Sequence, residues 1–305
     1  MQNKNLKKKY VFVGDLNSIN IELISKSHLT LKNKVNYILI GNYIKVHAYL
    51  KKIKSNLFLN EIFDPFGFSD YKKTFLNIFH IEDISKDNFK NILNQIKIAN
   101  EMSNHTKYDL ITMPINKAIF KKNMDFIGMT EYLGELNNKK TIMLMHGEHF
   151  SIVPYTTHIE INKINLYLKK NLITEFLDNL YKFIQMKKYS LYFKKINFVC
   201  HNPHCGEDET LGLEDKNISE ILTEYKKISG PIPADSAFLN IKKGTLFIST
   251  YHDQALIPFK IINKRGINFT LGLEYRRLSP THGTASDIKF KNKANNSSYI
   301  ACMQI

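Results

Sequence analysis

The sequence predicts an α/β protein whose core is a mostly parallel sheet with helices on both faces. Strand-like and helix-like segments alternate from the start of the chain: residues 10–13 precede 19–25, and residues 37–40 precede 43–53. Such alternation is typical of parallel strands joined by crossover helices. With 305 residues, 43% hydrophobic and 23% charged, the chain has enough apolar material for a large core. We therefore expect two domains or one large α/β unit.

Each predicted element follows from its local pattern. The apolar run at residues 10–13 ends at Gly14-Asp15, and residues 109–113 form another strand before a further helix. The later strands are expected at residues 141–145, 196–200, 246–250 and 267–271, and the long helices at 163–186 and 216–227. Residues 58–86 are aromatic-rich without clear periodicity and suggest a loop with a satellite core.

The charge pattern argues against a nucleic-acid partner, although the formal charge of +15 raises that possibility. Most basic residues are lysines in short scattered runs, which is typical of a solvated surface, and helix-turn-helix, zinc-finger and RNP patterns are lacking. The arginines are Arg265, Arg276 and Arg277, within a window of thirteen residues. Because arginine binds anions bidentately, this window predicts an anion-recognition site.

The three cysteines are too few for a disulfide framework in a chain of this size, which fits a reducing compartment. No apolar run approaches the roughly 18 residues that cross a bilayer, and no signal-peptide core follows the basic start. We expect a cytoplasmic protein without a membrane partner.

Three histidines follow predicted strands. His158 comes after Thr156-Thr157, while His204 and His252 follow the strands at 196–200 and 246–250. Ligands of α/β proteins bind beyond the carboxyl ends of strands, and neutral imidazole is a common ligand of transition metals. Although each histidine alone is more typical of an ordinary structural position, together they predict a metal site.

Two other interpretations of these segments stay open. Cys200, His201, His204 and Cys205 could form a structural zinc site, but a second ligand pair at the usual separation is lacking. The turn at residues 230–236 holds Asp235 between rigid prolines and could equally be an ordinary turn.

An ordered series of motifs resembles the 4-hydroxythreonine-4-phosphate dehydrogenase family of pyridoxal phosphate biosynthesis. The motifs are Pro114-Ile115-Asn116-Lys117, Thr130-Glu131, Thr157-His158, Asn202-Pro203-His204, Gly206-Glu207, Pro233-Ala234-Asp235, Tyr251-His252-Asp253-Gln254, Asn268 to Gly272 and His282-Gly283-Thr284-Ala285.

The resemblance implies a fold similar to isocitrate and isopropylmalate dehydrogenases, with two α/β/α domains, a cleft between them, and a homodimer whose partner contributes to each site. Residues 1–127 with 270–305 would form the terminal domain, which carries the cofactor loop. Residues 128–269 would form the central domain, which carries the metal histidines.

The resemblance also assigns site residues. His158, His204 and His252 would bind one divalent metal ion (Zn, Mg or Co). Thr130, Lys260, Asn268 and Arg277 would hold the substrate. The NAD-binding loop would comprise His282, Gly283, Thr284, Ala285, Asp287 and Asn295. Because an acidic Asp287 would repel a 2′-phosphate, we expect NAD rather than NADP.

The implied reaction is NAD-dependent oxidation of 4-phosphohydroxy-L-threonine to 2-amino-3-oxo-4-phosphooxybutanoate, which decarboxylates to 3-amino-2-oxopropyl phosphate. The metal would lower the pKa of the substrate hydroxyl while a base accepts its proton. Lys260, Asp235, Asp253 or a metal-bound hydroxide could each be that base.

The chain departs from the family pattern in three places. The glycine-rich loop after the first strand reads Gly14 to Glu22 with Ser18 and Asn20 in place of glycines, which predicts a strained or repositioned loop. Met129 replaces a substrate-contacting histidine, and Lys289-Phe290 replaces small residues beside the cofactor loop. The alternatives are a dehydrogenase of a different phosphorylated hydroxy acid, a decayed family member, or a basic nucleic-acid-binding protein.

Overall fold

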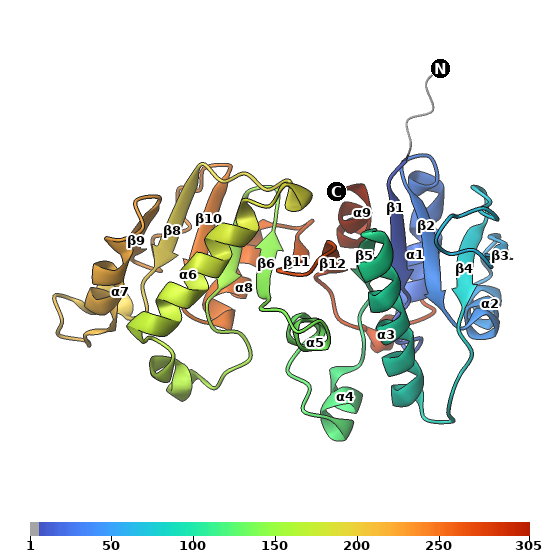
Figure 1. The fold of residues 1–305 in the computed structure, drawn as a ribbon, viewed down its shortest axis with the longest axis horizontal. Helices are drawn as coiled ribbons and strands as arrows, with labels where there is room; N and C mark the ends of the chain where they lie inside the picture. The colour runs from blue at the N-terminus through green and yellow to red at the C-terminus, as the bar shows by residue number, and fades with distance from the viewer. Residues whose placement is uncertain (1–5) are drawn as a thin grey trace, which may run out of the picture. The chain divides into compact units, whose positions relative to one another are not determined.

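The computed structural model describes residues 6–305, so the first five residues of the predicted terminal domain lie outside the described part. It confirms the α/β class, because strands and helices alternate along the chain (Figure 1). The chain divides into two compact units. The first extends to residue 133 and resumes at 273–305, and the second comprises residues 134–272.

The first unit is built on a parallel sheet with strand order β3-β4-β2-β1-β5-β12. Its strands β1 and β2 contain fully buried apolar runs, such as Tyr10 to Phe12, which is the pattern of a sheet covered on both faces. The strands are β1 (Lys8–Phe12), β2 (Asn36–Gly41), β3 (Leu59–Glu61), β4 (Leu76–His80), β5 (Asp109–Thr112) and β12 (Arg277–Pro280). The helices are α1 (Asn20–Leu31), α2 (Tyr43–Lys52), α3 (Asn88–Thr106), α4 (Lys117–Asn123), α5 (Met129–Leu136), which reaches into the second unit, and α9 (Ser297–Gln304), with the short turn η4 (Ser286–Ile288).

The two halves of the first unit are joined by a buried ionic network. The Lys9 ammonium lies 3.1 Å from the Asp109 carboxylate and donates to the carbonyl of Cys302 in α9. Arg276 donates through two nitrogens to the same carboxylate. Burial lowers the pKa of Lys9, although Asp109 opposes this shift. Figure 1 shows that the C-terminal α9 lies near the N-terminal β1 and α1.

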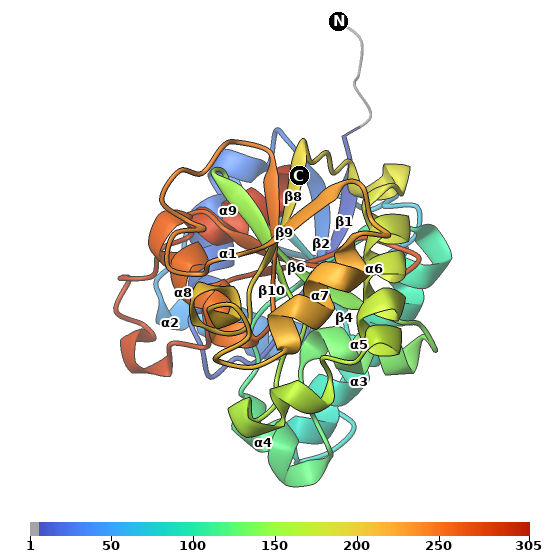
Figure 2. The ribbon, with the colours of Figure 1, turned by 90° about the vertical axis from the view of Figure 1, so that its left-hand side faces the viewer.

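The second unit has a mixed sheet with strand order β11-β6-β7-β10-β8-β9. Its strands β7, β10, β8 and β9 are parallel, whereas β6 pairs antiparallel with β7 and β11. Figure 2 shows α8 on one side of these strands and α6 and α7 on the other. The elements are β6 (Ile142–His146), β7 (Phe150–Pro154), η1 (Ile161–Leu166), α6 (Lys170–Ile184), η2 (Lys187–Tyr189), β8 (Lys195–Val199), η3 (Pro203–Gly206), α7 (Glu214–Leu222), β9 (Ile228–Ile232), β10 (Thr245–Ser249), α8 (His252–Ile262) and β11 (Ile267–Leu271).

Four predicted segments differ from the structure. The helix expected at 216–227 is α7, which ends at Leu222. The helix expected at 163–186 is interrupted, because the extended Lys169 separates η1 from α6. Residues 58–86 contain the edge strand β3 and its neighbour β4 rather than only a loop. The proline-containing turn begins with the edge strand β9, where Pro231 is tolerated because an edge strand leaves one side of its backbone unpaired.

None of the helices in residues 6–305 combines the length and apolar character needed to cross a membrane.

Candidate active site

The three predicted metal ligands follow neighbouring strands of the second unit. His158, His252 and His204 come after β7, β10 and β8, which lie side by side and run parallel. Their segments therefore leave the same edge of the sheet. His252 is the first residue of α8, His204 lies in the short turn η3, and His158 lies in the connection after β7.

The structure brings His158 and His252 together. Their ring centroids are 5.5 Å apart and the ring planes are inclined by 38°. Two imidazoles on one tetrahedral ion have ring centres about 5 Å apart, given metal–nitrogen bonds of about 2.0–2.1 Å. The pair therefore fits two ligand positions of a divalent ion. Asp253 lies 2.6 Å from Nδ1 of His252, which leaves Nε2 as the ligand atom.

His204 does not complete this pair within one chain. Its Nδ1 lies 4.0 Å from the Asp235 carboxylate, and both side chains are more than half exposed, at 60% and 65%. In residues 6–305, no group of three or more His, Cys, Asp or Glu side chains could hold a metal ion. Left-handed backbone continues from His204 through Glu209, an arrangement that is costly for residues other than glycine.

The alternative zinc site at Cys200, His201, His204 and Cys205 is not formed in the described residues. Burial raises the pKa of the Cys205 thiol to about 12, so this thiol stays protonated at neutral pH.

Arg277 forms the most deeply buried part of the predicted substrate site. Only 3% of this residue is exposed, its Nε donates to Thr112 Oγ1 at 2.8 Å, and its Nη1 lies 3.5 Å from Thr130 Oγ1. Burial lowers the pKa of Arg277 to about 10, so the guanidinium remains charged at neutral pH. Thr112 was missed in the sequence, because it looks like the end of an ordinary buried strand.

The other two arginines of the predicted anion-binding window have different partners. Arg276 is committed to the buried network with Asp109 and Lys9. Arg265 is exposed and lies 3.6 Å from the Glu148 carboxylate. Of the three clustered arginines, Arg277 therefore remains a candidate ligand-binding residue, whereas Arg265 and Arg276 have other partners.

Lys260 and Asn268 both belong to the second unit but differ in burial. Lys260 lies on the exposed side of α8, two turns after His252. Asn268 is half-buried on β11, and its enclosed side-chain oxygen finds no hydrogen-bond partner among residues 6–305. A buried acceptor of this kind is suited to a ligand or water that donates a hydrogen bond.

The predicted cofactor loop is anchored to the first unit. The Thr284 carbonyl accepts a hydrogen bond from the Ile19 N–H at 3.1 Å. Burial lowers the pKa of His282, which keeps the imidazole neutral, and its Nε2 has no hydrogen-bond partner in the part of the chain that the structure describes. Gly283 faces open space, and Ala285 has a left-handed backbone.

The acidic Asp287 is exposed on η4. Asn295 instead accepts the Ser297 N–H at 2.9 Å at the start of α9, so its side-chain oxygen already has a local partner.

The loop after β1 accommodates its unusual residues without the expected strain. Neither Ser18 nor Asn20 has a positive φ. The Asn20 side-chain nitrogen donates to the carbonyls of Val13 and Pro114 at 3.0 and 2.9 Å. Gly14 does need glycine, because it has φ +71° and a Cβ there would lie 2.5 Å from the Pro114 carbonyl oxygen.

The other two substitutions are absorbed by packing. Met129 is partly buried against the apolar core of the first unit. The Phe290 ring lies 4.8 Å from that of Tyr49, and the Lys289 ammonium donates to Asn17 at 2.9 Å. The altered cofactor segment and the altered loop after β1 therefore contact each other directly.

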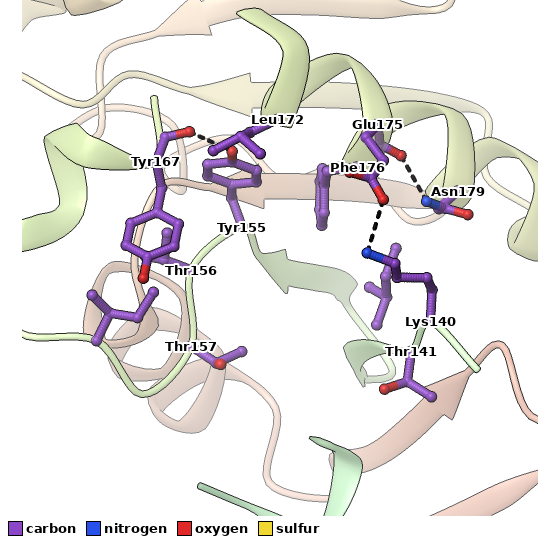
Figure 3. Close-up of a pocket in the computed structure, with 12 residues that line it drawn as sticks. Lys140, Thr141, Tyr155, Thr156, Thr157, Tyr167, Leu172, Glu175, Phe176 and Asn179 are labelled. Atoms are coloured by element: carbon purple, nitrogen blue, oxygen red, sulfur yellow. Dashed lines mark hydrogen bonds and ion pairs between the residues drawn. The ribbon is translucent and has the colours of Figure 1, made fainter. Parts of the chain in front are cut away.

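A pocket of about 290 Å³ opens beside the His158 segment (Figure 3). It is lined in part by Thr156 and Thr157, which directly precede His158. Lys140 pairs with Glu175 at 3.0 Å within it. A second pocket, of about 440 Å³, lies in the first unit and is lined mainly by apolar side chains. Neither of these two pockets includes Lys260, Asn268 or Arg277.

Comparison with known proteins finds relatives along most of the chain. Residues 18–305 match the family described as Pyridoxal phosphate biosynthetic protein PdxA. The 4-hydroxythreonine-4-phosphate dehydrogenase of Campylobacter fetus is 32% identical over 313 residues, covering 98% of this chain and 97% of that enzyme. The Aquifex aeolicus enzyme of the same name is 38% identical over 207 residues, a match that covers 65% of this chain and 64% of that enzyme, slightly less than two thirds of its length.

Solved structures show the same fold. The 4-hydroxythreonine-4-phosphate dehydrogenase of Klebsiella pneumoniae superposes with a TM-score of 0.80 at 23% identity, covering 98% of this chain and 97% of that one. A terephthalate 1,2-cis-dihydrodiol dehydrogenase from Burkholderia xenovorans superposes with a TM-score of 0.61 at 17% identity, covering 98% of both chains. At these identities the likeness concerns the fold alone.

Proposed function

This chain belongs to the family of the pyridoxal phosphate biosynthetic protein PdxA, and from that premise we propose that it is a 4-hydroxythreonine-4-phosphate dehydrogenase. The substrate would be 4-phosphohydroxy-L-threonine, oxidised to 2-amino-3-oxo-4-phosphooxybutanoate. This β-keto acid would then lose carbon dioxide to give 3-amino-2-oxopropyl phosphate. NAD would accept the hydride, and the exposed Asp287 supports NAD over NADP.

The paired imidazoles of His158 and His252 carry the proposal. Their spacing suits two ligands of one divalent ion, and Asp253 orients His252 through Nδ1. A zinc, magnesium or cobalt ion held there would polarise the substrate hydroxyl and the carbonyl formed from it. Because residues 6–305 of one chain do not gather a third ligand, we propose that a homodimer completes the site with the exposed His204 of a second copy.

Arg277 would bind an anionic group of the substrate. Its buried guanidinium is held by Thr112 and by Thr130, so little side-chain freedom would be lost on binding. A charged, planar donor in such surroundings suits a phosphate or a carboxylate. Asn268 would accept a hydrogen bond from a donor group of the substrate through its enclosed oxygen.

The proton acceptor would be Lys260 or Asp235, since Asp253 already accepts from His252. Lys260 would also contact the substrate. We further propose a reducing, cytoplasmic setting, which is supported by the three free cysteines.

The test is NADH formation, followed by absorbance, from 4-phosphohydroxy-L-threonine and NAD. Treatment with EDTA should abolish turnover, and added Zn²⁺, Mg²⁺ or Co²⁺ should restore it. A folded protein that binds metal and NAD but does not turn this substrate over would contradict the proposal.

A different phosphorylated hydroxy acid is the second candidate substrate. Met129 favours it, because this side chain packs against the apolar core and cannot donate a strong hydrogen bond to a ligand. Turnover of a panel of phosphorylated hydroxy acids, with 4-phosphohydroxy-L-threonine as reference, distinguishes the two.

A further inference from the structure

The segments that carry the three histidines are connected through one buried residue, Thr250. This residue directly follows β10, and its side chain and backbone are fully buried. Its carbonyl accepts two hydrogen bonds from Thr156, from the backbone N–H at 3.1 Å and from the hydroxyl at 2.6 Å. Thr156 precedes His158 by two residues, so the end of β10 is tied to the His158 segment.

Gln254 connects the end of β10, at Thr250, to the segment that leads to His204. Its side-chain oxygen accepts the Thr250 N–H at 2.9 Å, and its side-chain nitrogen donates to the Cys200 carbonyl at 2.8 Å. Cys200 directly follows β8 and begins the segment that leads to His204. Since one partner is a backbone donor and the other a backbone acceptor, the orientation of the Gln254 amide is fixed by its surroundings.

The position of Gln254 relates it to His252 as well. It lies in the first turn of α8, two residues after His252. The Thr250 hydroxyl adds a weaker contact, 3.3 Å from Nδ1 of His201. The side chain of Gln254 and the backbone of Thr250 thus link the segments of His158, His204 and His252.

We propose that Gln254 is a positioning residue that fixes the geometry of the histidine segments for metal binding. This inference rests on the proposed metal-dependent function and deepens it. It names the residue that positions the strand ends from which the proposed metal ligands follow. Gln254 acts through the backbone of Thr250 and Cys200, and Thr156 supports it from the β7 side.

Co²⁺ titration of the metal-depleted full-length protein, followed by the visible absorption of the bound ion, tests this role. Gln254→Met keeps the length of the side chain but removes its hydrogen bonds to Thr250 and Cys200. We expect Co²⁺ to bind about tenfold or more weakly, with a changed absorption spectrum, because loss of groups that orient metal ligands typically costs ten- to hundredfold in affinity. Gln185→Met makes the same chemical change at an exposed position after α6 and should leave affinity and spectrum unchanged.

A milder variant keeps the inference testable if Gln254→Met fails to fold. Thr156→Val removes only the hydroxyl contact with Thr250 and should weaken Co²⁺ binding several-fold in the same direction. The double variant should show less than the sum of the two effects, since both act on the same residue.

Two results would overturn the inference and are distinguishable. If the wild-type protein binds Co²⁺ and folded Gln254→Met and Thr156→Val bind it with the same affinity and spectrum, Gln254 has no positioning role and the proposed function is unaffected. If the wild-type protein binds no Co²⁺ at all, both the metal part of the proposed function and this inference are wrong.

Discussion

The Arg277 region and the histidine region differ in how completely one chain builds them. Arg277, in the first unit, is buried and held by two threonine hydroxyls. The side chain of His252, in the second unit, is one-third exposed, and His204 lies apart from the His158–His252 pair. A group that is packed before its ligand arrives loses little freedom on binding, whereas metal ligands have to remain accessible to the ion. The proposed anion-binding group is thus held in place before a ligand binds, whereas the proposed metal site would need a second copy of the chain to complete it.

Removing a histidine of the proposed metal site should have the largest effect on kcat/KM. We expect His252→Ala to lower kcat/KM by more than about a hundredfold, beyond the usual cost of losing a group that only orients a ligand. Metal content should fall, while the thermal midpoint of the protein without metal stays close to the wild-type value. Metal analysis, steady-state kinetics and thermal unfolding check this. Full activity with normal metal content would rule out His252 as a ligand.

Replacing Arg277 should have a smaller effect on kcat/KM. Arg277→Lys keeps the charge but replaces a planar fork with a single donor group. We expect a loss of roughly ten- to hundredfold in kcat/KM, corresponding to about 1.5–3 kcal/mol for hydrogen bonds to a charged group. Steady-state kinetics with the phosphorylated substrate measure this loss.

The neighbouring Arg276 provides the matched control. Arg276→Lys should lower the free energy of unfolding, because it disturbs the buried Asp109 network, and should leave KM unchanged. Unaltered kinetics for Arg277→Lys would remove the case for a bidentate contact.

Replacing Met129, at the start of α5, with a polar residue tests the substrate-binding part of this comparison. Met129→His should raise kcat/KM about two- to tenfold if the enzyme acts on 4-phosphohydroxy-L-threonine, the gain expected from one added hydrogen bond of about 0.5–1.5 kcal/mol. Kinetics on that substrate provide the measurement. No gain, or a loss, would instead support a changed substrate.

Low pH should lower the free energy of unfolding of both units. We expect this to be the smallest of the four predicted effects. Burial lowers the pKa of His28 in the first unit and of His146 in the second. Folding therefore keeps both imidazoles neutral while the unfolded chain takes up protons below about pH 6.5, so stability is lost as the pH falls through that value. Denaturant unfolding between pH 7.5 and 5.5 should show this loss.

Two variants assign that pH dependence to the units. His28→Gln should reduce it for the first unit, where burial also lowers the pKa of His282, and His146→Gln should flatten it for the second. A pH dependence identical in both variants and in the wild type would show that these histidines do not cause it.

The sequence predicted the fold class well because its signal is local. The apolar runs at residues 10–13 and 37–40 and the helical pattern at 43–53 correspond to β1, β2 and α2 within a few residues. The edge strand β3 was not predicted, because it has three half-buried residues and little apolar pattern. Likewise, Pro231 made β9 look like a turn, since only its place at the sheet edge makes a proline acceptable there.

The candidate site was less predictable, because its residues depend on tertiary partners. Arg276 and Arg277 are adjacent and identical in type, yet one faces Asp109 and the other Thr112. Likewise, no local pattern marks Gln254 as a bridge between two strand ends. The roles of His158, His204 and His252 remain predictions from motif and strand position, supported for two of the three by proximity.

The bond between Lys9 and the Cys302 carbonyl has a consequence for synthesis of the protein. The two residues are 293 positions apart, so at ribosomal rates of about 5–20 residues per second β1 emerges roughly 15 to 60 s before its partner in α9. Residues 134–272 are continuous and can fold once they have left the exit tunnel. We therefore expect residues 134–272 to complete their fold before the first unit does, because the first unit needs residues 273–305.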